Sequence, residues 1–233
     1  MILSVHQPHY LPWLGYFHKI ASSDCFVFLD CVQYKPREFQ NRNKIRTEKG
    51  GIWLTVPVQM KHKGRQVIRE VLIDNEFPWM RQHARSLQTW YARAPYFNEY
   101  FPFFEDLYQK AWEKLTDLNV YIIRHVLTQL SIETPVYFES ACDIQGTKTD
   151  RIIELCKKMN ADTYLSGTGG KEYLEQDKFI KAGITLEYQE FVHPQYRQQF
   201  LSRNDDFIPC MAIIDLLFNE GHKSKEILYI SNK

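Results

Sequence analysis

Three side chains near the start of the chain are suited to moving protons. His6 ends an apolar, partly β-branched run, His9 lies three residues later, and Asp30 follows a second apolar run, residues 25–29. Histidine and carboxylate groups exchange protons when they lie close to a reacting atom. If the two runs are neighbouring parallel strands, His6 and Asp30 share the carboxyl edge of the sheet, where ligands of α/β proteins bind. We therefore expect His6 to act as a general base, Asp30 to orient or assist it, and His9 to lie beside them.

Hydrogen-bond donors gather around two further segments. Residues 34–44 form the densest polar stretch, and Ser166-Gly167-Thr168-Gly169-Gly170 directly follows a third apolar run. Arginine and lysine side chains can clamp a diphosphate, amide side chains can bond sugar hydroxyls, and closely spaced glycines let backbone amides approach a phosphate or an oxyanion. The expected substrate-binding residues are Gln7, Tyr10, Trp13, Lys19, Arg37, Gln40, Asn41, Arg42, Asn43, Lys148, Ser166, Gly167, Gly169 and Gly170.

Other site classes receive less support from the sequence. Lys148 lies in Gly146-Thr147-Lys148-Thr149-Asp150 before a predicted helix, which is typical of an ordinary N-cap and also of a phosphate site. The basic run from Lys61 to Arg65 could close over an anion or be a solvated loop. His6, His9 and Asp30 could converge on a metal, but no Cys/His spacing supports this, and we expect no metal.

The order of the predicted elements indicates an α/β chain. Strands are expected at 1–5, 25–29, 134–138, 161–165 and 184–188, with helices at 14–21, 149–159 and 211–219. A β-hairpin is expected over 45–57, because Gly50-Gly51 supplies a tight turn. Residues 67–73 are expected to be extended, and helical patterns at 79–91, 97–115 and 118–130 predict an insertion over about 78–131. Asp215 lies within the last apolar helix and requires a partner, most simply an arginine or a backbone amide. We expect one α/β domain over residues 1–233, with a Rossmann-like, mostly parallel sheet.

Composition sets limits on partners and location. The formal net charge is +1, so no bulk attraction to nucleic acid or to a membrane is expected. The five cysteines are odd in number and form no Cys-x-x-Cys pair, which is typical of reduced thiols. No leader and no apolar run of about 20 residues is present, so we expect a cytoplasmic protein. The sequence does not indicate an oligomeric state.

Four stretches resemble one family along essentially the whole chain. They are the opening segment from His6 to Ile20, Gln40-Asn41-Arg42-Asn43, Trp53-Leu54-Thr55-Val56-Pro57-Val58 and the 166–170 loop. Together they are similar to the WbqC-like family, and the resemblance extends to residues 214–218. It implies a role in bacterial surface polysaccharide biosynthesis, in which O-antigen or capsule sugars are built.

The resulting hypothesis is an enzyme that transfers an acyl or aminoacyl group, glycyl being one candidate, to a nucleotide-linked amino sugar. The donor would be ATP with an amino acid, or an aminoacyl-tRNA. Two other classes stay open. His6 and His9 have the spacing of the His-x-Gly-His motif of nucleotidyl transfer, with Pro8 in the glycine position, which favours an ATP-dependent nucleotidyltransferase or ligase. A non-catalytic module that binds sugar, or binds RNA through residues 40–46, would turn nothing over.

Overall fold

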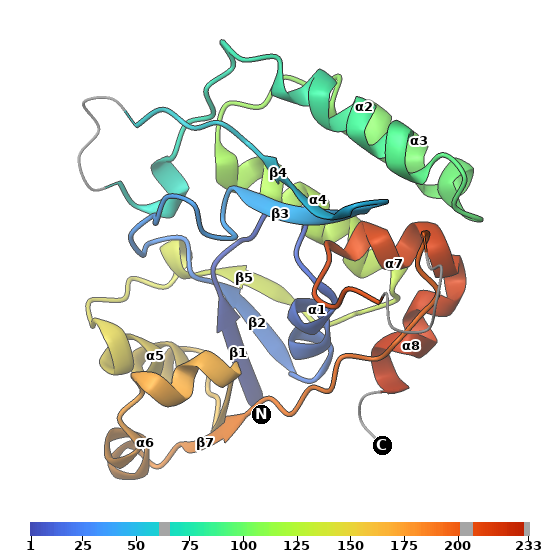
Figure 1. Cartoon of the computed structure of the whole chain (residues 1–233). Helices are drawn as coiled ribbons and strands as arrows, with labels where there is room; N and C mark the ends of the chain where they lie inside the picture. The colour runs from blue at the N-terminus through green and yellow to red at the C-terminus, as the bar shows by residue number, and fades with distance from the viewer. Residues whose placement is uncertain (61–65, 201–206, 231–233) are drawn as a thin grey trace.

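The apolar runs form a parallel sheet at the centre of the molecule. The computed structural model describes residues 1–60, 66–200 and 207–230, and within these the sheet has five strands in the order β5-β2-β1-β6-β7 (Figure 1). All four neighbouring pairs are parallel. The expected α/β fold is therefore confirmed. The strands are β1 (Ile2–His6), β2 (Cys25–Phe28), β5 (Val136–Phe138), β6 (Thr163–Ser166) and β7 (Thr185–Tyr188). The basic run 61–65 lies outside the described residues.

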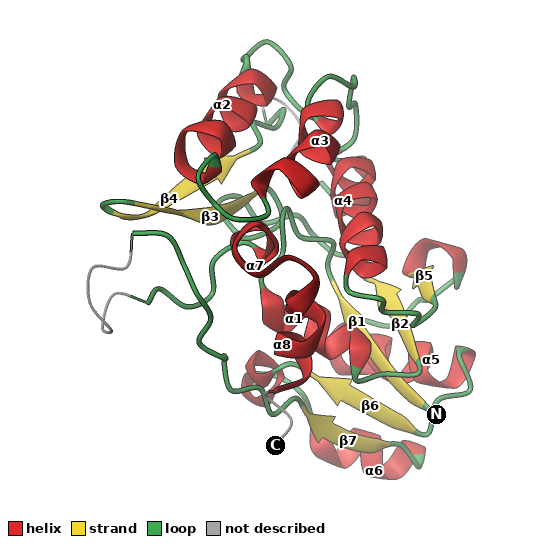
Figure 2. Cartoon of the chain, turned by 90° about the vertical axis from the view of Figure 1, so that its right-hand side faces the viewer, coloured by secondary structure: helices red, strands yellow, loops and turns green. Residues whose placement is uncertain are grey.

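Side-chain alternation along the strands divides the core into two layers. In β2, Cys25 and Val27 pack into one apolar cluster, whereas Phe26 and Phe28 pack into the other. A strand whose residues are buried on both faces needs cover from both sides. Helices α5 (Lys148–Lys158) and α6 (Gln176–Ala182) cover one face, and α1 (Leu14–Ala21) lies on the other (Figure 2). This arrangement leaves the carboxyl edge of the sheet open to loops.

The predicted hairpin is present, with a shifted start. Strands β3 (Arg42–Thr47) and β4 (Gly50–Thr55) pair antiparallel, and the turn places Gly50 at φ +110°, where glycine is favoured. β3 begins three residues before the expected position of Ile45. Arg42 and Asn43 therefore belong to a strand rather than to a polar loop.

Three helices follow the hairpin without an intervening strand, as predicted. They are α2 (Trp79–Tyr91), α3 (Phe97–Leu107) and α4 (Leu115–Gln129). Helix α3 ends eight residues earlier than expected, and α4 begins three residues earlier. Residues 67–73, which were expected to be extended, contain a 3-10 turn, η1 (Ile68–Glu70). The Trp112 indole donates to the Leu107 carbonyl at 2.9 Å, and the Leu115 amide to the Val71 carbonyl at 3.0 Å, so the chain leaves the helix to pack on the η1 segment.

The last third of the chain adds helices that the sequence pattern did not predict. Besides the expected α7 (Ile213–Glu220), there are α6 and α8 (Ser224–Ile230), each seven residues long. Short 3-10 turns lie at η2 (Glu139–Ala141), η3 (Thr168–Glu172) and η4 (Gly221–Lys223). Helices this short show too few turns for a clear apolar period.

Asp215 in α7 anchors the hairpin through neutral donors. Its carboxylate accepts hydrogen bonds from Tyr91, Tyr196 and Gln198, each at 2.8 Å. The Tyr91 hydroxyl in turn accepts from the Arg46 amide of β3 at 2.8 Å. Burial raises the pKa of Asp215. The requirement for a partner was correctly predicted, but the hydrogen-bonding partners of the side chain are tyrosine and glutamine rather than arginine or a backbone amide.

Candidate functional site

A pocket opens at the point where the strand order changes direction. From β1 the chain continues to β2 and β5 on one side and then crosses to β6 and β7 on the other. Ligands of open α/β sheets bind outside the carboxyl ends of the strands at such a switch point. Here a cavity of about 240 Å³ lies between the ends of β1 and β6. It is lined by Val5, His6, Gln7, Lys19, Leu29, Tyr164, Ser166, Gly167, Gly169, Gly170 and Tyr173.

Lys19 is the charged residue of this pocket. Its side chain is 3 % exposed, and its Nζ donates to the Val5 carbonyl at 3.0 Å. No carboxylate lines the pocket, and Lys19 forms no salt bridge among the described residues. Burial lowers the pKa of Lys19 to about 7. A buried ammonium group without a carboxylate partner is stabilised when an anion enters.

The two histidines lie together beside Lys19. The His6 and His9 rings are 4.4 Å apart, and the Tyr16 ring of α1 is 4.9 Å from His6. Burial, with the charge of Lys19, lowers the pKa of His9 to about 3 and that of His6 well below its usual value. Both imidazoles are therefore neutral at pH 7. His6 lines the pocket and is available to accept a proton. His9 contacts the His6 ring and does not line the pocket.

The glycine-rich loop forms the opposite wall. The sequence left open whether this loop and the N-terminal loop form one site, and the structure places Ser166, Gly167, Gly169 and Gly170 in one pocket with His6 and Lys19. A Cβ at Gly170 would overlap Ser166 Oγ and lie 2.9 Å from Leu174 Cδ1, so any side chain there would force both residues to move. A Cβ at Gly167 would meet Lys19 Nζ at 3.8 Å, whereas Gly169 faces open space. The loop thus brings backbone close to the lysine.

The amide side chains of Asn41 and Asn43 bond to backbone carbonyls and do not line the pocket. Asn41 donates to the Val56 carbonyl at 2.9 Å, and Asn43 to the Leu11 carbonyl at 2.6 Å. Gln40 donates to the Gln7 side chain, which does line the pocket. Asn41 and Asn43 are both buried. Their amide hydrogens are used within the protein, so this placement gives no support to the expected bonds to sugar hydroxyls.

Five other expected residues lie away from the pocket lining. Tyr10 is buried and bonds to His83 and Tyr108, and the Trp13 ring stacks at 6.0 Å on His193. Arg37 is exposed with φ +65°, and Arg42 lies over the Trp53 ring. Lys148 is exposed at the start of α5. Just before α5 the Gln145 and Gly146 amides both donate to Glu154 at 3.0 Å, so two amides next to the considered phosphate site are already occupied.

Asp30 belongs to a separate group, which we call the Asp30 cluster: Asp30, Cys31 and Glu139 with Arg69 and Arg151. Ser140 donates to both Asp30 oxygens, at 3.0 Å from its amide and 2.6 Å from its hydroxyl. Glu139 pairs with Arg151, and Arg69 donates to the Cys31 sulfur at 3.1 Å. No hydrogen bond joins Asp30 to His6 among the described residues. This geometry does not support Asp30 as the residue that orients His6.

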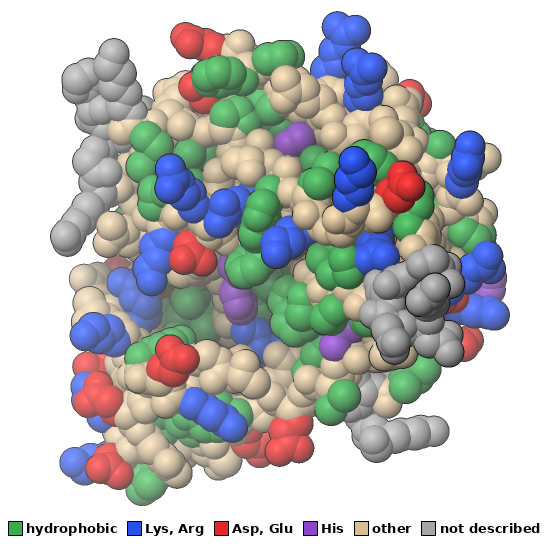
Figure 3. Space-filling model, in the orientation of Figure 1, with side chains coloured by type: hydrophobic (Ala, Val, Ile, Leu, Met, Phe, Trp, Pro, Cys, Tyr) green, Lys and Arg blue, Asp and Glu red, His purple; other side chains and the backbone are tan. Residues whose placement is uncertain are grey.

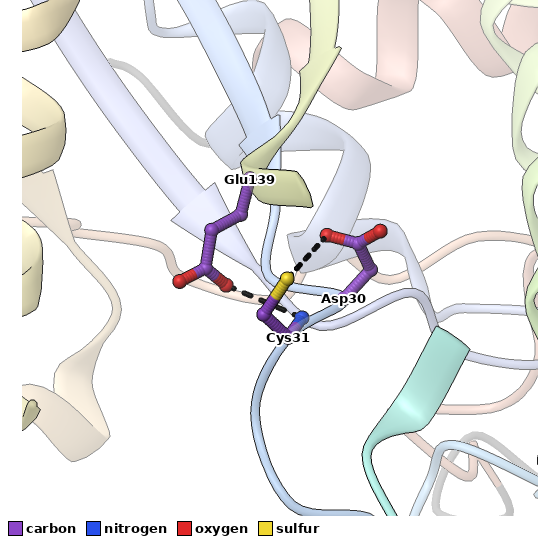
Figure 4. A group of neighbouring side chains, drawn as sticks. All are labelled: Asp30, Cys31 and Glu139. Atoms are coloured by element: carbon purple, nitrogen blue, oxygen red, sulfur yellow. Dashed lines mark hydrogen bonds between the residues drawn. The ribbon is translucent and has the colours of Figure 1, made fainter. Parts of the chain in front are cut away.

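The Asp30 cluster is also where a metal could be held. Ligand atoms of Asp30, Cys31 and Glu139 lie within 4.8 Å of one another, and Cys31 bridges the two carboxylates (Figure 4). Burial and Asp30 raise the pKa of the Cys31 thiol to about 11, and burial raises the pKa of Glu139. The carboxylates already accept hydrogen bonds from Ser140, Arg151 and the Cys31 amide. A cation would have to displace these donors, so the cluster fits a metal poorly.

The sequence analysis missed two tyrosines of the pocket. Tyr164 lies within β6 and Tyr173 follows η3, and both line the cavity. Tyr173 is 58 % exposed. The sequence signal that could have identified Tyr173 was its position three residues after Gly170, within the same loop. On the face shown in Figure 3, the surface is hollowed at this edge of the sheet, with lysine, arginine and histidine side chains in and above the hollow.

Comparisons with known proteins assign the chain to a family. The model of the WbqC-like protein family matches residues 7–227. The chain belongs to the WbqC-like family. A relative from Mycobacterium tuberculosis, named "Uncharacterized protein Rv1507c", is 32 % identical over 228 residues, which is 97 % of this chain and 96 % of the relative. No solved structure matches the chain. The family match covers the pocket residues from Gln7 to Tyr173 and begins one residue after His6.

None of the helices in residues 1–60, 66–200 and 207–230 combines the length and the apolar character needed to cross a bilayer. The five cysteines Cys25, Cys31, Cys142, Cys156 and Cys210 carry free thiols.

Proposed function

We propose that this WbqC-like protein is a transferase of bacterial surface polysaccharide biosynthesis, acting on a nucleotide-linked amino sugar. The observation that carries the proposal is Lys19: a buried cation without a carboxylate partner, facing a glycine-rich loop at the switch point of the sheet. Such a position suits the phosphates of a nucleotide-linked ligand. We propose that the protein acts in the cytoplasm, and its free thiols support this.

The proposed reaction is transfer of an acyl or aminoacyl group, glycyl being one candidate. The sugar amine attacks the carbonyl carbon of an activated acyl ester, forming a C–N bond as the C–O bond breaks. His6 takes the proton that the amine loses, and the departing oxygen is then protonated. A neutral imidazole lining the pocket supports this role, because a protonated histidine has no free lone pair for the proton.

Phosphate binding and proton transfer are assigned to different residues. Lys19, in its ammonium form, holds phosphate, and the backbone of residues 167–170 lies next to it. Tyr173 at the open side of the pocket offers a ring face for the sugar or the base. His9 contacts His6 and fixes its position. Asp30 has no part in this scheme.

A mass-spectrometric assay tests the proposal. Purified protein is offered a panel of nucleotide-linked amino sugars, with ATP and amino acids in one set and aminoacyl-tRNA in another. We expect a mass gain on the sugar, and the set in which it occurs identifies the donor. The His6→Ala protein should keep sugar binding but lose turnover by about 10²–10⁴-fold. Tight binding without any mass gain in either set would instead indicate a binding module.

A second candidate is an ATP-dependent nucleotidyl or ligase reaction, favoured by the contact of His6 and His9 beside Lys19. It requires imidazolium groups to stabilise charge on phosphate, and the pKa of about 3 for His9 weighs against this. Release of pyrophosphate from ATP, dependent on magnesium and on both histidines, would support this reaction in place of acyl transfer.

A further inference from the structure

Aromatic rings continue from the pocket across the surface to the hairpin. His9 contacts His6 on one side and Phe39 on the other, at 5.9 Å, and Phe39 lies 5.9 Å from Trp53 of β4. We call His9, Phe39 and Trp53, with Arg42 and Lys44 of β3, the aromatic strip. Phe39 is 41 % exposed and Trp53 is 40 % exposed. The strip is thus an open surface that begins at the candidate site.

Two cations are held in place on this strip. The Arg42 guanidinium lies 4.2 Å from the centre of the Trp53 ring, and Lys44 Nζ lies 4.9 Å from it. Cation–π contacts of this kind fix long side chains that otherwise move freely. Within the described part of the chain neither cation forms a salt bridge, and Arg42 Nε is buried without a hydrogen-bond partner. Arg42 and Lys44 therefore carry charge that an external anion can neutralise.

The hairpin is held rigidly under the strip. Asn119 of α4 donates to the Pro8 carbonyl at 3.0 Å and to the Gln40 carbonyl at 2.7 Å. The same side chain therefore holds both the loop after β1, which carries His9, and the segment before β3. The Tyr10 amide also donates to the Phe39 carbonyl at 3.0 Å. The rings and cations are thus positioned relative to the pocket before any partner binds, which lowers the entropic cost of binding.

We propose that the aromatic strip binds unpaired nucleotides of an RNA, directing its end toward His6. The inference rests on the proposed function, because an acylated RNA end is a donor that the transfer reaction can use. Exposed rings with two fixed cations at the Trp53 end match the bases and phosphates of a single strand. A neutral glycan would use the rings and leave the two cations unpaired. The net charge of +1 provides no long-range attraction, so binding depends on these local contacts.

Fluorescence anisotropy with a labelled ten-nucleotide single-stranded RNA tests this inference. The double variant Arg42→Gln/Lys44→Gln should weaken binding at least tenfold. It should also reduce the slope of log affinity against log salt by about 1.4, the value for two phosphate contacts on a single strand. The matched control is Arg81→Gln/Arg85→Gln, which removes two exposed charges from α2. An equal loss in the control would overturn the inference, because it would show that charge alone drives binding.

Loss of a single ring gives an independent measurement. Phe39→Ala should weaken RNA binding about tenfold, as expected for one base–aromatic stack. Phe77→Ala removes another exposed ring, 59 % exposed and preceding α2, and should leave the affinity unchanged. A ten-residue polyglutamate peptide that binds as tightly as the RNA would overturn the inference. Absence of RNA binding by the unaltered protein at 25 mM salt would do the same.

The unaltered protein also separates this inference from the proposed function. Binding of a nucleotide-linked sugar without binding of RNA overturns the inference and leaves the proposed function intact. Binding of RNA without binding or modification of any nucleotide-linked sugar supports the strip as a nucleic-acid site and removes the proposed function.

Discussion

The pocket at the ends of β1 and β6 and the Asp30 cluster at the ends of β2 and β5 share one edge of the sheet, but their charges are satisfied differently. In the cluster, Glu139 pairs with Arg151, and Asp30 accepts from Ser140. In the pocket, Lys19 bonds to a backbone carbonyl and faces no carboxylate. A buried charge with internal partners ties elements together, whereas one without them is poised for a ligand. The comparison identifies the pocket, and not the cluster, as the place to look for function.

The largest effect should follow from Lys19→Met, which removes the cation and keeps the length of the side chain. Affinity for a nucleotide-linked sugar should fall at least 100-fold, measured by isothermal titration calorimetry. Because burial disfavours the ammonium group, the same variant should raise the free energy of unfolding by roughly 1–3 kcal/mol at pH 6. Weaker binding together with lower stability would show that Lys19 is a structural residue.

Removing the partner in the Asp30 cluster should have the reverse pattern. Arg151→Met leaves the 1 % exposed Glu139 side chain without its main cation, so stability should fall by roughly 3–5 kcal/mol in urea unfolding. Sugar affinity of the folded fraction should change less than twofold. Lys178→Met, which breaks the exposed pairs with Asp150 and Glu175, is the control and should cost about 0–1 kcal/mol. A large loss of affinity in the Arg151 variant would erase the distinction between the two regions.

The two glycines of the loop offer a matched pair of substitutions. Gly170→Ala places a Cβ against Ser166 Oγ and Leu174, so we expect sugar affinity to fall at least tenfold and stability to fall by about 1–3 kcal/mol. Gly169→Ala meets nothing within 4 Å and should change stability by less than about 0.5 kcal/mol. Equal effects in the two variants would show that the fit of the loop against Ser166 does not matter.

Sugar affinity should depend on pH through Lys19. In the free protein its pKa is about 7, far below that of an exposed lysine, and phosphate binds the ammonium form. Affinity should therefore be constant below pH 7 and fall by up to tenfold for each pH unit above it. Stability should change in the other direction, rising between pH 7 and about pH 10, because in this range the folded lysine has lost its proton while the unfolded lysine still binds one. Calorimetry from pH 6 to 9 checks the first expectation, with the Lys19→Met protein as the pH-independent reference.

The smallest effect is expected at Lys148, outside both regions. Because Glu154 already occupies the nearby amides, Lys148→Gln should change sugar affinity less than twofold. A tenfold loss would place phosphate at the start of α5 and contradict the pocket as the main anion site.

The sequence predicted which residues lie at the carboxyl ends of the strands. His6 and Ser166 were each expected at the carboxyl end of a strand, and they end β1 and β6. That the two loops meet in one pocket was not predicted. Contacts between distant residues were not predictable. Asp30 bonds to Ser140, 110 positions away, and Glu154 accepts from the Gln145 amide beside a helix start that the sequence showed only as an N-cap or a phosphate site. A local pattern shows which groups can bond, but the packing of helices decides which partners they meet.

The carboxylate of Asp215 affects how well the hairpin tolerates substitutions. Through Tyr91 it holds the backbone of β3 from the core side, so the position of the hairpin does not depend on its exposed side chains. Substitution of Trp53 or its neighbours on the outer face should therefore change the exposed surface of the hairpin and leave its backbone in place.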